Sequence, residues 1–142
     1  MEETTDKIQK DAQLLESFGL LPRRHAGQQV MIRFKNPHWI SATARECRAL
    51  RLEPGASIGG CATPEFCGKS FGLYACGELA ERLASRPAGE PVQARATYRF
   101  GILREVHPAP EQPVLEEWTF TALVLTEILA GVPGDGAPVV EK

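Results

Sequence analysis

The chain has 142 residues, of which 43% are hydrophobic and 24% are charged, and its formal net charge is −2. This length predicts one domain with its own core, and no run approaches the roughly 18 apolar residues that a membrane span requires. The polar N-terminus lacks the apolar segment of a secretory signal peptide, so we expect a cytoplasmic protein whose four cysteines are reduced.

The N-terminal part predicts one amphipathic helix and then a change of period. Helical spacing over 4–18 places four apolar side chains on one face, at Ile8, Ala12, Leu15 and Phe18. Residues 22–29 indicate a linker, and the alternating run 30–34 indicates a strand. The stretch 39–55 fits a helix capped by Ser41 or a strand that continues into a loop, and we favour the strand.

The C-terminal part predicts strands around one short helix. The runs 56–62 and 70–75 are strand-like, a helix follows at 78–85, and 91–103 alternates strictly. On that last strand the apolar face holds Val92, Ala94, Ala96, Tyr98 and Phe100, whereas the polar face holds Gln93, Arg95, Thr97 and Arg99. Three prolines place 107–113 in a loop, and residues 116–129 form the final strand.

These elements predict a mainly β fold. Five strands with a short helix between the third and fourth fit a five-stranded OB-like Greek-key barrel with an added N-terminal helix. The expected divisions are an N-terminal helix (1–21), a linker (22–29), an OB-like domain (30–130) and a flexible tail (131–142).

Motifs for catalysis or metal binding are incomplete. "TPEFCGKS" (63–70) ends like a phosphate-binding P-loop but lacks its first glycine, since Thr63 stands there. The cysteines show no closely spaced pair, so a zinc site is the minor alternative to four small apolar side chains. No nucleophile is paired with a base in a known motif. We therefore expect no enzyme activity and no cofactor or bound metal.

Basic and aromatic residues indicate a nucleic-acid ligand. Residues 22–51 carry seven bases and one acid, a balance of +6 within a mildly acidic chain. Single strands are bound by such mixtures, because bases stack on rings while cations contact phosphates. Alternation directs Tyr74 away from Phe71, Leu73 and Ala75, which makes Tyr74 the best stacking candidate on its strand.

Residues 74–100, "YACGELAERLASRPAGEPVQARATYRF", and 118–131, "WTFTALVLTEILAG", resemble the third strand, short helix, fourth strand and final strand of bacterial single-stranded DNA-binding proteins. The resemblance covers about residues 40–130 and implies the OB fold and single-strand binding. Some aromatic positions of the family differ here, with Cys76 and Leu103 in their places. The chain ends in "PVVEK" instead of the family's acidic tail.

We therefore predict non-catalytic binding of single-stranded DNA, or of RNA, by stacking and phosphate contacts. The stacking residues would be Trp39 and Tyr74, and the phosphate contacts would be Arg33, Lys35, Lys69, Arg95 and Arg99. Because the two arginines at 95 and 99 point outward, replacing them is expected to leave stability unchanged. The alternatives are an OB-like assembly subunit without nucleic-acid affinity and a cysteine-bound zinc module. We expect a homo-oligomer, or a subunit of a larger complex docked through the N-terminal helix.

Overall fold

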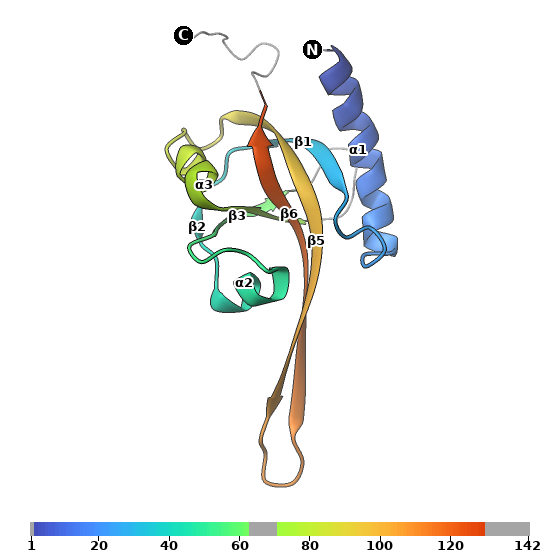
Figure 1. The fold of residues 1–142 in the computed structure, drawn as a ribbon, viewed down its shortest axis with the longest axis vertical. Helices are drawn as coiled ribbons and strands as arrows, with labels where there is room; N and C mark the ends of the chain where they lie inside the picture. The colour runs from blue at the N-terminus through green and yellow to red at the C-terminus, as the bar shows by residue number, and fades with distance from the viewer. Residues whose placement is uncertain (1, 63–70, 130–142) are drawn as a thin grey trace.

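One six-stranded mixed sheet with three helices around it forms the molecule in the computed structural model (Figure 1), which describes residues 2–62 and 71–129. The sheet order is β1-β5-β6-β4-β3-β2, and all neighbours are antiparallel except β4 and β6. The elements in chain order are α1 (Glu2–Leu20), β1 (Gln29–Lys35), β2 (Ile40–Ser41), α2 (Ala44–Leu50), β3 (Ser57–Ala62), β4 (Phe71–Ala75), α3 (Gly77–Ala84), β5 (Pro91–His107) and β6 (Val114–Ile128).

The predicted closed barrel of five strands is wrong, because the sheet is open. Its two edge strands, β1 and β2, are consecutive in the chain, but no backbone ladder joins β1 to β2 or β3 within the described residues. Asn36, in the connection between them, is buried and bonds to other elements instead. Its side-chain amide donates to the carbonyls of Leu83 at 3.0 Å and Arg86 at 3.1 Å, at the end of α3. The chain therefore turns toward α3 at the point where a barrel would close.

Helix α1 was predicted correctly and covers an edge of the sheet. It lies beside β1 (Figure 1), and the buried carboxylate of Asp11 accepts a hydrogen bond of 2.7 Å from the backbone amide of Met31. An exposed edge strand invites pairing with other chains, and the helix blocks that approach here. Leu15 and Phe18 are fully buried in the main core, so α1 belongs to the same packed unit as the sheet.

The segment 39–55 is where the predicted strand is wrong. Only Ile40–Ser41 is extended, and α2 follows. Thr43 begins the helix with a capping box: its hydroxyl accepts from the amide of Glu46, whose side chain accepts from the amide of Thr43. Helix α2 covers the outer face of β4 and β6 and creates a second core cluster with Leu50, Leu52, Ala56, Tyr74, Ala122 and Val124.

Strands β5 and β6 form a long hairpin that projects from the body of the domain (Figure 1). Continuous pairing runs from Ala94↔Ile128 to His107↔Val114, with one irregularity at Arg95/Ala96. We call the projecting residues, 101–120, the arm. The alternation predicted for β5 is confirmed: Val92, Ala94, Ala96 and Tyr98 are buried together in the main core.

The short helix before β5 was also predicted correctly, as α3 (Gly77–Ala84). The expected linker (22–29) packs on the sheet. The backbone amide of Gly27 donates to the carbonyl of Tyr98, and the backbone amide of Tyr98 donates to the carbonyl of Gln28, both at 2.8 Å. The predicted tail at 131–142 lies outside the described residues. Among the described helices, none combines the length and apolar character needed to cross a membrane.

Candidate nucleic-acid interface

A pocket of about 680 Å³ opens where the loop after α1, the end of α2 and β5 meet. We call it the arginine pocket, because each of these three segments contributes one arginine to its lining: Arg23, Arg51 and Arg99. Its lining residues are Arg23, Ala26, Ala49, Leu50, Arg51, Arg99, Phe100, Gly101 and Ile102. The volume falls in the range of small-molecule sites, and it suits one nucleotide-sized group.

Close packing of α2 on β5 forms one side of the pocket. Gly101 makes this approach possible, since a Cβ added there would lie 2.4 Å from the backbone oxygen of Ala49. Any larger residue at 101 would push the helix away from the strand. The shape of the pocket thus depends on the glycine at position 101.

Arg51 ends α2 in a backbone conformation that favours glycine. Its φ of 57° and ψ of 48° place it in the left-handed region, and its amide donates to the carbonyl of Cys47. For a residue with a Cβ this conformation costs roughly 1–2 kcal/mol relative to the right-handed helix. Strain of this kind gathers at functional sites, where a side chain is held in a required place.

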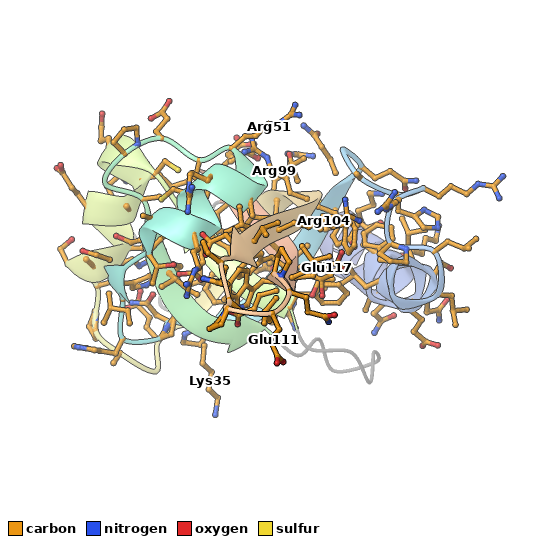
Figure 2. All side chains as sticks on the ribbon, turned by 90° about the horizontal axis from the view of Figure 1, so that it is seen from below. Lys35, Arg51, Arg99, Arg104, Glu111 and Glu117 are labelled. Carbon is orange, nitrogen blue, oxygen red and sulfur yellow. The ribbon has the colours of Figure 1, made fainter. Side chains whose placement is uncertain are left out.

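Arg99 links β5 to the same helix end. Its guanidinium donates from Nη1 to the carbonyls of Leu50 at 2.8 Å and Arg51 at 3.0 Å. The last carbonyls of a helix have no partner within the helix, so Arg99 satisfies two of them. In Figure 2, Arg51 and Arg99 lie side by side at one edge of the molecule.

No carboxylate of residues 2–62 and 71–129 neutralises the charge of the pocket. Arg23, Arg51 and Arg99 form no ion pair with any carboxylate of the described residues. Ala26, Ala49 and Leu50 add apolar lining beside these guanidinium groups, whereas the side chains of Phe100 and Ile102 leave β5 on the face opposite Arg99. The combination can hold an anion through the arginines.

Tyr74 lies in the second core and is only 3% exposed. Its hydroxyl donates to the Glu46 carboxylate at 2.5 Å, which fastens α2 to β4. Burial alone would raise the pKa of Glu46, but the hydrogen bonds from Tyr74 and from the amide and hydroxyl of Thr43 lower it below its ordinary value. A buried ring has no open face for a base, and we remove Tyr74 from the proposed interface.

Trp39 and Lys35 lie apart from the arginine pocket. The indole of Trp39 is partly buried and donates to Asn36 Oδ1 at 2.7 Å, and its ring fills the space above Gly59. Lys35 is exposed at the end of β1, on the opposite side of the molecule from Arg51 and Arg99 in Figure 2. The structure therefore does not bring these two predicted residues to the same site as Arg99.

Arg33 and Arg95 share the outer face of β1 and β5 with Arg99. The register Met31↔Arg95 makes Arg33 and Arg95 diagonal neighbours. Arg33 donates to the side chain of Gln93 at 3.4 Å, and Arg95 pairs with the exposed Glu127 at 3.2 Å. Four residues of extended strand separate Arg95 from Arg99, about 13 Å.

Lys69 and the P-loop-like segment 63–70 lie outside the described residues. In the part of the chain that the structure describes, no three His, Cys, Asp or Glu side chains gather to hold a metal ion. Cys47 and Cys76 are free thiols, both partly buried.

Sequence reasoning missed two of the three arginines of the pocket. Both belong to the +6 segment. An extended 39–55 gave no reason to place Arg51 near β5, and Arg23 lies in the predicted linker 22–29, where no local pattern pointed to β5. The signal that could have found Arg51 is the pattern Thr43-x-x-Glu46, which marks the start of a helix. A seven-residue helix from there ends next to Arg51.

Comparison with models of known protein families and with curated proteins finds no match to this chain. The resemblance to bacterial single-stranded DNA-binding proteins thus stays a prediction.

The two carbonyl contacts of Arg99 predict a loss of stability when they are removed, contrary to the expectation from alternation alone. We expect Arg99→Ala to lower the free energy of unfolding by about 1–2 kcal/mol, because two helix-end carbonyls lose a charged donor. Urea denaturation measures this. Arg95→Ala is the matched control, since its exposed ion pair with Glu127 contributes at most about 1 kcal/mol. Equal stability of both variants would contradict the capping role.

Proposed function

We propose that the chain binds single-stranded nucleic acid, with DNA favoured over RNA, at the arginine pocket, without catalysis. The observation that carries the proposal is the pocket itself: three arginines without carboxylate partners in the described residues line it together with apolar residues. Guanidinium groups bind phosphate oxygens through paired hydrogen bonds, and an apolar lining suits the face of a base.

The dimensions of the pocket support a flexible strand over a duplex. The pocket lies between the loop after α1, the end of α2 and β5, so only a part of a ligand about the size of one nucleotide enters it. In a duplex the bases are paired inward and cannot turn into such a site without unstacking. A single strand presents phosphate and base together.

Arg95 and Arg33 extend the proposed path beyond the pocket. Both lie on the outer face that Arg99 shares, and the distance of about 13 Å from Arg99 to Arg95 corresponds to about two nucleotides of an extended strand. The exposed Glu127 partner of Arg95 is readily replaced by a phosphate, because surface ion pairs are weak. In the cytoplasm, the location proposed for this chain, it would have access to such strands.

The test is a fluorescence-anisotropy titration of the full chain with labelled oligo-dT and a duplex of equal length. We expect tighter binding of the single strand, with an affinity that falls with salt by a slope of about 0.7 for each phosphate contacted. Equal affinity for both forms, or no binding at low salt, would refute the proposed function.

A further inference from the structure

The arm is a two-stranded ribbon whose outer edges are open. The pairing of β5 with β1 ends at Thr97, and β6 pairs with β4 only from Ala122 to Val124. Within the described residues, no third strand continues along 101–120. A two-stranded ribbon alone in water is marginally stable, so an arm of this length is expected to gain stability from a partner.

Three large apolar side chains are exposed on the arm: Val106 at 63%, Val114 at 52% and Leu115 at 60%. Val106 and Leu115 stand directly opposite each other in the ladder and form one apolar pair. Val106 is an even number of residues from Tyr98, so this pair lies on the core face of the hairpin, beyond the ion pair of Arg104 with Glu117. An exposed apolar pair on a projecting ribbon can contact another surface.

The arm is also acidic. It carries four glutamates and one arginine, a balance of −3 with His107 uncharged. Glu105 is held by Arg45 and Arg48, and Glu117 by Arg104. Glu116 lies 2.7 Å from His107, and Glu111, at the tip of the arm in Figure 2, pairs with no cation of the described residues, so unpaired negative charge remains at the tip.

A second exposed surface on the same chain is basic where the arm is acidic. It consists of residues 20–24, and we call it the leucine–arginine corner. Leu20 is 81% exposed and Leu21 is 51% exposed, and Arg23 and Arg24 follow. Neither arginine pairs with a carboxylate of the described residues. Since Arg23 also lines the arginine pocket, the corner and the pocket are continuous.

The arm cannot reach the corner of its own chain. The ladder is continuous to His107↔Val114, and the arm points away from the end of α1 (Figure 1). The ion pair of Glu105 with Arg48 at 3.2 Å, on α2, helps to hold that direction. Contact between two arms is disfavoured because each tip carries the unpaired negative charge of Glu111.

We propose that the arm of one copy docks on the leucine–arginine corner of a second copy, with Val106 and Leu115 against Leu20 and Leu21 and the arm's glutamates facing Arg23 and Arg24. If each of two copies docks its arm on the corner of the other, they form a closed two-fold dimer. If docking occurs in one direction only, a chain of copies forms. A docked arm places carboxylates at the mouth of the arginine pocket. If the proposed function holds, arm and single strand compete for Arg23.

Sedimentation velocity of the full chain, without nucleic acid, tests the contact. We expect reversible self-association that weakens with salt. The arm variant Val106→Ser/Leu115→Ser and the corner variant Leu20→Ser/Leu21→Ser should each weaken it roughly 100-fold, about 10-fold for each side chain that is no longer buried. Circular dichroism should show both variants folded, because all four side chains are exposed.

Mixing the two variants is the decisive measurement. Each is a monomer alone, but the intact corner of the arm variant can accept the intact arm of the corner variant, so the mixture should form a one-to-one complex. A monomeric wild-type chain, or an arm variant that still associates, would overturn the proposal. A corner variant that associates as tightly as wild type would show an arm–arm contact and overturn it as well.

Single-strand binding at the arginine pocket and the contact between arm and corner can be refuted independently of each other. Self-association that persists in a chain without affinity for oligo-dT leaves the arm contact intact and refutes only the binding function. If both hold, saturating oligo-dT should shift the assembly toward the monomer, whereas a duplex should not.

Discussion

Replacing Tyr98 by alanine is expected to lower the free energy of unfolding by about 3–5 kcal/mol, because truncating a buried aromatic leaves a cavity. The ring is fully buried, lies stacked on Phe18 with centroids 4.5 Å apart, and meets Phe71 edge-on at 5.9 Å. It therefore joins α1, β4 and β5 at the centre of the main core. Urea denaturation followed by circular dichroism measures the loss, and a change below 1 kcal/mol would contradict this packing.

Tyr98→Phe is the control that keeps the ring. The Tyr98 hydroxyl is buried without a hydrogen-bond partner among the described residues, so its removal should leave stability unchanged or raise it by up to about 1 kcal/mol. Burial raises the pKa of Tyr98 from 10.0 to about 12. The folded chain thus keeps the proton longer than the unfolded chain. The corresponding stability is complete below about pH 10 and is lost as the pH rises through 12, a loss that Tyr98→Phe should lack.

The double change Arg23→Ala/Arg51→Gly is expected to weaken binding of oligo-dT while it stabilises the fold. Each lost phosphate contact lowers the salt slope by about 0.7, which corresponds to about 5-fold in affinity at 0.1 M salt and roughly 25-fold for both. Glycine at position 51 relieves the left-handed conformation, so unfolding should require about 0.5–1 kcal/mol more. Anisotropy titrations at several salt concentrations and urea denaturation measure the two effects.

Lys35→Ala/Arg82→Ala is the charge-matched control for this variant. Both side chains are exposed and neither lines the arginine pocket. We expect its affinity to fall much less, through the general loss of positive charge alone. Equal weakening by the two double variants would mean that binding depends on net charge and not on the pocket.

The candidate site depends on α2, which lies in the stretch 39–55, where the sequence pattern fitted either a helix or a strand. Alternation on β4 correctly directed Tyr74 away from the main core, but only α2, folded over that face, turns the outward side into a second core. The same helix carries Arg51 to β5 and gives Arg99 two carbonyls to bind. The missed capping box therefore left Tyr74 in the prediction as a stacking residue and kept Arg51 out of it, whereas Arg23 comes from the loop after α1.

The sequence by itself determined the features that depend on near neighbours in the chain. The apolar spacing of Ile8 to Phe18 predicts α1, and the strict alternation of Val92 to Tyr98 predicts which face of β5 is buried, because helix and strand periods are local properties. The tertiary structure alone decided the rest. Asn36 holds the connection between β1 and β2 to the end of α3, some fifty residues away, and the pocket forms where the loop after α1, the end of α2 and β5 meet. Such contacts join residues distant in sequence, and no local pattern records them.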